Sequence, residues 1–272
     1  MDPDLFGDVP DGLTGRARAF VRAHGVKVGV RHAEDHRRWW LERDVPAAVV
    51  DRMAAHQERR GGLVLPPASR YEGGPRHLAA DSPEGSGSGG WWFEAGTQRS
   101  SVPYGFRIGP SGEFGIRSDR WVPLRATVEG WVESLAPARH ASLWAERIVK
   151  VTGDDVGGVV PDGFEPVPEA RGLADTWRRG ADSPVAVHTG EAEALSFPRG
   201  RTALVSSGSD EWGLRGGVED GAGRERRERA PAHRARPARR PRDGGPGVAG
   251  DNRRRLPDPV RRRGDPAHRG SF

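Results

Sequence analysis

The fold is decided by residues 90–135, which read GWWFEAGTQRSSVPYGFRIGPSGEFGIRSDRWVPLRATVEGWVESL. On both sides of the Pro-Ser-Gly at 110–112, apolar side chains recur at every second residue: Phe106, Ile108, Phe114 and Ile116. This spacing predicts two strands joined in a β-hairpin. A strand over 91–94 before the hairpin and an edge-like strand over 121–124 after it extend the predicted sheet.

The same stretch ends in a predicted amphipathic helix. Thr127 is a suitable N-cap, and four apolar side chains follow at i, i+3, i+4 and i+7. They are Val128, Trp131, Val132 and Leu135. We expect this face of the helix to pack against the sheet.

Shorter patterns surround this centre. Before it we expect helices over 14–24, 32–43 and from Pro46 to 60, short strands over 26–30 and 63–65, and a loop over 68–90. After it we expect a second helix over 141–149, a linker over 161–168, a helix over 173–179, and strands over 185–188, 194–197 and 202–206. The fold class is therefore α+β, with a mostly antiparallel central sheet packed by helices. We divide the chain into a main domain (1–150), a smaller α+β unit (151–217) and a tail (218–272).

The tail differs sharply in composition from the rest. Residues 218–272 carry 16 Arg, no Lys and 8 acidic residues, so the other 217 residues sum to −3 against the total of +5. With so few apolar side chains the tail cannot offset the entropy cost of ordering, and we expect it to be disordered. Its Arg-, Pro- and Gly-rich content is also what a GC-rich bacterial gene yields when read out of frame, so a frameshift near residue 217 is a second interpretation. An Arg-rich arm that binds nucleic acid is a third.

Composition also limits the chemistry. The chain has no cysteine, which excludes disulfides and thiolate sites. The acidic start MDPDLFGD is unlike a signal peptide, and no apolar run approaches the ~18 residues of a membrane helix. We expect a cytoplasmic protein that does not enter membranes, with no cofactor and no metal. The glycines at 85–90 match the G-x-G-x-x-G motif of dinucleotide-binding proteins. They lack the preceding strand and following helix that this motif requires, so we expect no dinucleotide site there.

The clustered tryptophans give the candidate site. Trp91 and Trp92 are neighbours on one predicted strand, so their side chains must face opposite sides of the sheet. Core packing explains most tryptophans here, yet one of this pair is expected to face solvent or a partner. Exposed Trp and Arg are typical of protein interfaces. We therefore predict a partner-binding site of Trp91, Trp92, Glu94, Asp119 and Arg120.

Two segments resemble the SUKH superfamily of bacterial immunity proteins. Val45-Pro46 leads a helix to Gly61-Gly62, and residues 126–135 (ATVEGWVESL) resemble the family's late segment of a hydroxyl residue followed by an amphipathic helix. The resemblance covers about residues 40–147. It implies an α+β domain without a cofactor that binds and neutralises a toxin, often a nuclease or deaminase.

Two other functions stay open. One is a hydrolase-like enzyme with a dispersed site between the two units, for which His56, His140, Asp119 and Glu94 are the titratable candidates. The other is nucleic-acid binding through the Arg-rich tail, which requires that residues 218–272 are in the native frame. A non-enzymatic, protein-binding module is the main prediction.

Overall fold

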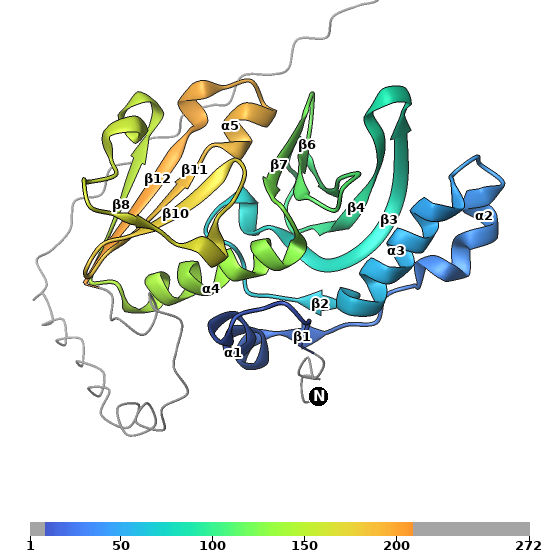
Figure 1. Ribbon diagram of the computed structural model, residues 1–272, viewed down its shortest axis with the longest axis horizontal. Helices are drawn as coiled ribbons and strands as arrows, with labels where there is room; N and C mark the ends of the chain where they lie inside the picture. Colours follow the sequence, from blue (N-terminus) through green and yellow to red (C-terminus); the bar gives the residue numbers. More distant parts are fainter. Residues whose placement is uncertain (1–8, 209–272) are drawn as a thin grey trace, which may run out of the picture. The chain divides into compact units, whose positions relative to one another are not determined.

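The computed structural model describes residues 9–208, which all fall in one compact unit, and their fold is α+β as the sequence predicts (Figure 1). The strands form three sheets in which every pairing is antiparallel. Within this part of the chain, no helix is long and apolar enough to cross a lipid bilayer. The predicted tail over 218–272, with its alternative interpretations, lies outside the described residues.

The first sheet has five strands in the order β3-β4-β5-β6-β7, so each strand pairs with its neighbours in sequence. The strands are β3 (Pro75–Ser86), β4 (Gly90–Gln98), β5 (Gly105–Ile108), β6 (Phe114–Arg117) and β7 (Trp121–Arg125). The predicted hairpin is confirmed, because Phe106 pairs with Ile116 and Ile108 pairs with Phe114. These four side chains share one face of the sheet and are all buried.

Two helices pack on that face. Helix α3 (Ala47–Arg60) lies against β3, and helix α4 (Val128–Trp144) contacts β7 (Figure 1). The predicted apolar stripe of α4 is buried. The ring of Trp131 stacks on Phe114 with 4.9 Å between centroids, and Phe114 in turn stacks on Phe106 at 6.1 Å. An aromatic layer therefore joins α4 to the sheet.

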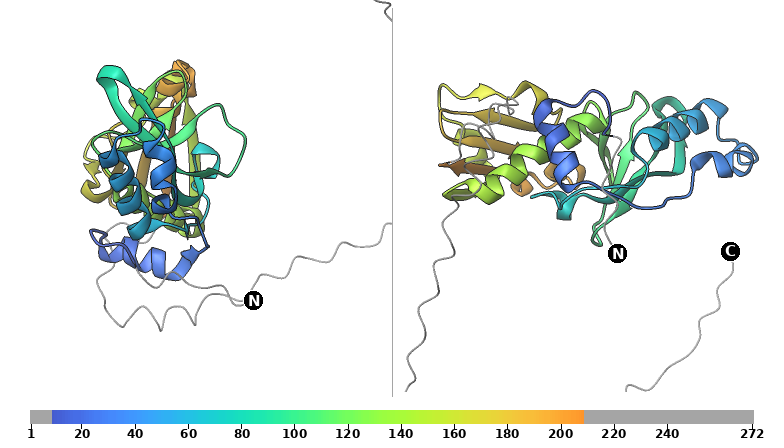
Figure 2. Two further views of the ribbon diagram at one scale, coloured as in Figure 1. Left: turned by 90° about the vertical axis from the view of Figure 1, so that its right-hand side faces the viewer. Right: turned by 90° about the horizontal axis from the view of Figure 1, so that it is seen from below.

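Threonine caps begin two helices, as predicted. The Thr127 hydroxyl accepts a hydrogen bond from the Gly130 N–H (3.2 Å) at the start of α4. The Thr14 hydroxyl accepts one from the Ala17 N–H (3.3 Å) at the start of α1 (Gly15–His24). Thr14 also donates its N–H and its hydroxyl to the two carboxylate oxygens of Glu133, at 2.5 and 2.9 Å. These bonds join α1 to α4, and the two helices lie side by side (Figure 2).

The second sheet has the order β8-β12-β11-β10-β9. Its strands are β8 (Arg147–Thr152), β9 (Glu165–Pro166), β10 (Asp175–Arg179), β11 (Pro184–His188) and β12 (Thr202–Ser207). The strands predicted over 185–188 and 202–206 are confirmed as β11 and β12. The domain boundary predicted at residue 150 falls inside β8.

The remaining elements are short. A two-stranded sheet consists of β1 (Val26–Lys27) and β2 (Leu63–Val64), and the short helices are α2 (Arg37–Leu41) and α5 (Gly190–Ala194). The 3-10 turns are η1 (Ala33–His36), η2 (Tyr71–Gly73), η3 (Gly87–Gly89), η4 (Gly153–Gly158), η5 (Pro168–Ala170) and η6 (Pro198–Gly200).

The loop predicted over 68–90 is wrong, because β3 occupies most of it. The register of β3 against β4 shifts three times, between Pro75 and His77, between Leu78 and Asp81, and again before Glu84. Each irregularity interrupts the alternation of side chains. A strand rich in Pro, Gly and Ser and without period two therefore looks like a loop in the sequence.

Four further predictions are wrong. The residues predicted as a helix over 173–179 form β10, which pairs with both β9 and β11. The strand predicted over 194–197 is the end of α5 and the turn after it. Helix α4 runs unbroken through Pro137, so the separate helix over 141–149 does not exist, and the predicted linker over 161–168 contains the edge strand β9.

Candidate functional site

Strand β4 places Trp91 and Trp92 on opposite sides of the first sheet. Trp91 packs, half-buried, against the hydrophobic core on the helix side, where its ring also lies close over Gly85. Trp92 lies on the other side and is 7% exposed. The alternation predicted for this pair is therefore present, but Trp92, the tryptophan turned away from the core, is buried and does not face solvent as predicted.

The strand register defines the face on which Trp92 lies, which we call the outer face. Cα partners share a face, and so do residues two apart on a strand. Glu84 pairs with Trp92, Glu94 with Arg107, and Arg117 with Trp121. The outer face thus combines two tryptophans, two arginines and two carboxylates: Trp92, Trp121, Arg107, Arg117, Glu84 and Glu94.

The two arginines of the outer face are held by Glu84. Arg117 Nη2 lies 3.4 Å from one Glu84 oxygen, and Arg107 Nη2 lies 3.8 Å from the other. Arg107 Nη1 also donates to the Ser82 carbonyl oxygen at 3.1 Å. The Arg117 guanidinium stands 4.9 Å from the centre of the Trp92 ring, a cation–π distance that explains why Trp92 is buried on this side.

Several N–H donors of the outer face have no acceptor among the described residues. They are Nε1 of Trp92, Nε of Arg107 and Nη1 of Arg117. Buried polar groups in folded proteins nearly always have a hydrogen-bond partner, whether protein or water. Three such buried donors lie on the outer face.

Not all of the predicted site residues share this face. Glu94 lies on the outer face with Trp92, whereas Trp91 faces the core. Asp119 and Arg120 lie exposed in the turn between β6 and β7. Arg120 Nη2 donates to the Ser196 hydroxyl at 2.5 Å, so its guanidinium is tied to the chain just after α5.

Arg107, Arg117 and Trp121 were missed by the sequence prediction. The signal was present in the hairpin itself, because Arg107 and Arg117 alternate with its apolar residues and therefore had to share the opposite face. Trp121 pairs with Arg117 and so joins them. The sequence alone does not show that Trp121 lies beside Arg117, because this depends on the register between β6 and β7.

The residues considered for an enzyme do not gather. His56, on α3, packs edge-to-face against Phe93 at 5.7 Å on the helix side of the sheet, while Glu94, the next residue, faces the other side. Burial, with the nearby charge of Arg60, lowers the pKa of His56 to about 3. His140, on α4, lies against Trp144 at 6.4 Å between ring centroids. The two histidines therefore occupy separate environments.

A buried polar network that the sequence did not reveal surrounds Asp175. The Tyr71 hydroxyl donates to Asp175 Oδ2 at 2.6 Å, and His188 Nδ1 lies 3.3 Å from the same oxygen. The N–H groups of Thr189 and Gly190 donate to Oδ1 at 3.1 and 3.3 Å. Every oxygen of this carboxylate is thus hydrogen-bonded.

Electrostatics explain why Asp175 is ionised there. Burial alone raises the pKa of this carboxyl, but the hydrogen bond and charge of His188, with Arg125 and Tyr71, outweigh it and hold the pKa below its ordinary value. Burial and the adjacent Asp175 carboxylate raise the pKa of Tyr71 well above its usual range. An Asp–His pair suits acid–base chemistry, yet Asp175 and Tyr71 are 1% and 2% exposed. The network therefore connects buried residues inside the protein and is not an active site that a substrate can reach.

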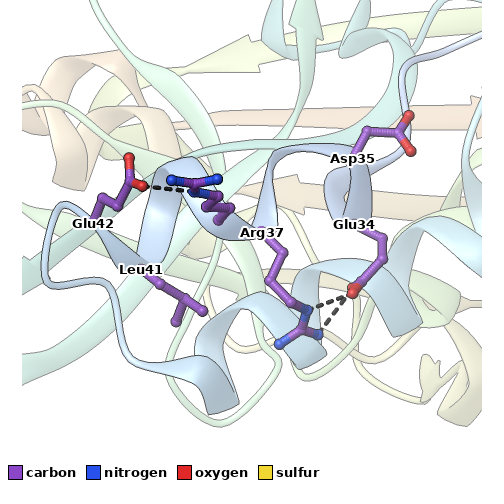
Figure 3. A pocket seen from close by; sticks show the side chains of 6 residues that line it. Glu34, Asp35, Arg37, Leu41 and Glu42 are labelled. Atoms are coloured by element: carbon purple, nitrogen blue, oxygen red, sulfur yellow. Dashed lines mark hydrogen bonds and ion pairs between the residues drawn. The ribbon is translucent and has the colours of Figure 1, made fainter.

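The short helix α2 borders an open pocket of about 580 Å³ (Figure 3). Both arginines of its lining are paired: Arg37 forms an ion pair with Glu34 and another with Asp51 (2.5 Å), and Arg38 forms one with Glu42 (2.8 Å). The guanidinium groups in this pocket are therefore already neutralised. Across residues 9–208, no three His, Asp or Glu side chains are arranged to hold a metal ion.

Comparison of the sequence with protein-family models gives no match, and neither curated proteins nor solved structures give one.

Proposed function

We propose that this chain is a non-enzymatic protein-binding module that binds its partner through the outer face of the first sheet. The observation that carries the proposal is the set of tryptophan and arginine side chains there, which Glu84 holds in place. Trp and Arg are the residue types that dominate binding energy at protein interfaces.

The arrangement favours binding because it is already ordered. Arg107 and Arg117 are held by Glu84, and Trp92 is fixed under Arg117. Side chains that are ordered before association lose less entropy when the partner arrives. The partner supplies cationic groups to Glu84 and Glu94.

The proposed partner is a toxin, which the chain neutralises by direct binding. This step rests on the resemblance of residues 40–147 to SUKH immunity proteins. The net charge of −3 over residues 1–217 is compatible with a basic toxin such as a nuclease. No cofactor takes part.

The experiment uses the protein encoded beside this chain's gene as the candidate toxin. Both proteins are purified and their affinity is measured by calorimetry for the wild type, Arg117→Ala, Glu94→Ala and the control Arg22→Ala on α1. We expect the two outer-face variants to bind at least about tenfold more weakly. The control variant is expected to bind like the wild type, since α1 lies on the helix side of the sheet.

Growth of cells that express the toxin gives a second readout. The wild-type chain and Arg22→Ala are expected to restore growth, and Arg117→Ala is expected to restore it less. Equal affinity of all variants would show that the partner uses another surface, and a neighbour that never binds would contradict the immunity proposal.

A further inference from the structure

Strand β8 is an edge strand whose outer side has no partner strand among the described residues. It pairs only with β12, through six consecutive residue pairs without a register shift. It contains no proline and no bulge, two of the features that commonly block an exposed edge, and its charged residues are Arg147 and Lys150. Five of its six side chains are exposed, and the sixth, Val151, is half-buried. The strand is thus straight and accessible.

The register shows which backbone groups of β8 point outward. The Gly153 N–H donates to the Arg201 carbonyl at 3.0 Å. Gly153 is two and four residues from Val151 and Val149, which pair with Ala203 and Val205. Hydrogen-bonded pairs alternate along an antiparallel ladder. The odd-numbered residues therefore bond to β12, and Ile148, Lys150 and Thr152 direct their N–H and C=O groups away from the sheet.

Exposed apolar side chains gather at the start of this edge. Leu143 and Trp144 end α4 with 53% and 56% of their surfaces exposed, and Ile148 and Val149 follow at 48% and 36%. Four large apolar side chains are thus exposed within seven residues, although Ile148 and Val149, as neighbours on the strand, face opposite sides of the sheet.

We propose that β8 pairs antiparallel with β8 of a second copy of this chain, with Ile148 on the twofold axis. In this register the two Ile148 residues exchange their outward N–H and C=O groups. Glu146 of each copy then stands opposite Lys150 of the other, because both positions are two residues from the axis. The dimer joins two five-stranded sheets into one and brings the two Ile148 side chains together on one face.

Charge selects this register over its neighbours. An axis at Val149 sets Lys150 opposite Ile148 and leaves it without a carboxylate, and an axis at Lys150 sets the two lysines opposite each other. Like charges directly opposite on paired strands are destabilising. Glu146 contributes its exposed carboxylate rather than its backbone, since its N–H donates to the Ser207 carbonyl at 3.0 Å. The same surface occurs on both copies, as twofold symmetry requires.

The test is the mass of the full chain in solution, followed by sedimentation equilibrium over a range of concentrations. We expect a dimer for the wild type. Lys150→Glu places two carboxylates opposite each other at both ends of the contact, and we expect the dissociation constant to rise by about tenfold or more. The double variant Glu146→Lys with Lys150→Glu exchanges the charges and is expected to restore the dimer.

Two further variants separate the contact at the axis from a general effect of charge. Ile148→Lys brings two lysines together at the axis and is expected to give a monomer whose thermal unfolding stays cooperative. Arg171→Glu makes the same charge change outside β8 and is expected to leave the dimer intact. Hydrogen exchange at the Ile148 amide, which bonds to the other copy at the axis, is expected to slow as the wild-type concentration rises.

A monomeric wild type overturns the proposal, as does a dimer that Lys150→Glu and Ile148→Lys leave unchanged. Failure of the double variant to restore association refutes the Glu146–Lys150 register. A monomer whose Ile148 amide is protected would place another part of the same chain on β8, which also overturns the proposal. None of these results depends on the outer face, whose variants are measured separately.

Discussion

Buried ionisable side chains link the stability of this protein to pH. His56 is 5% exposed and packs on Phe93, so its imidazole is neutral in the folded chain. Burial and the charge of Arg60 bring its pKa from 6.5 to about 3. The unfolded chain binds a proton at this residue below about pH 6.5, whereas the folded chain does so only near pH 3. Acid therefore favours the unfolded state through His56.

The variant His56→Gln removes this proton linkage. Between pH 6 and pH 4 we expect the wild type to lose about 2 to 3 kcal/mol more of its free energy of unfolding than the variant loses, at up to ~1.4 kcal/mol per pH unit. Urea denaturation at several pH values measures it. The half-buried His32→Gln serves as the control, and equal pH slopes in the wild type and His56→Gln would contradict the assignment.

At the scale of elements, α5 depends on a close approach of its first residue. A Cβ atom built on Gly190 would lie 2.1 Å from Leu124 Cδ2 and 2.8 Å from the Tyr71 hydroxyl oxygen. The absence of a side chain thus lets α5 rest against β7 while the Gly190 N–H reaches Asp175. Glycine here serves packing rather than an unusual backbone angle.

Gly190→Ala is expected to lower the free energy of unfolding by about 1 to 3 kcal/mol, the usual cost of overpacking a core. Chemical denaturation measures this loss. The matched control is Gly157→Ala, because nothing lies within 4 Å of the Cβ position at Gly157. A loss of similar size in both variants would show that the effect comes from the backbone and not from the contact with Leu124.

The sequence predicted the elements whose apolar side chains repeat at a regular spacing, and it did not predict the elements that lack such a repeat. The hairpin of β5 and β6 and the stripe of α4 repeat at the spacing of their own structure, so the sequence suffices for them. Strand β10 begins at Asp175 and carries Trp177 among arginines, which locally fits a helix as well as a strand. Its pairing with β11 makes it a strand, and a local sequence pattern cannot show which strand it pairs with.

At the scale of the whole described chain, Asp175 links residues from both larger sheets. Tyr71 precedes β3 of the first sheet, and His188 ends β11 of the second. Arg125, at the end of β7, is 1% exposed and donates to the Ala170 and Asp175 carbonyls. This shared buried network predicts that residues 9–208 unfold as one cooperative unit.

Asp175→Asn is expected to lower the free energy of unfolding by about 2 to 4 kcal/mol, because several buried hydrogen bonds lose their charged acceptor. Hydrogen exchange is expected to accelerate together in β4 and β11, while the exposed Asp182→Asn leaves both unchanged. Acceleration in β11 alone would show that the sheets unfold independently. Because the pKa of Asp175 is lowered, its stabilising contribution is present above about pH 4 and is lost as the pH falls below that value.

The sequence by itself determined the α+β class, the central hairpin, the capped helices and the alternation of Trp91 and Trp92. These features follow from side-chain period and capping, which are local. The tertiary structure alone decided which tryptophan joins Arg107 and Arg117, how Asp175 meets Tyr71 and His188, and that β8 lies at an edge. Those facts depend on strand register and on contacts between residues as many as 104 positions apart, for which no local pattern exists.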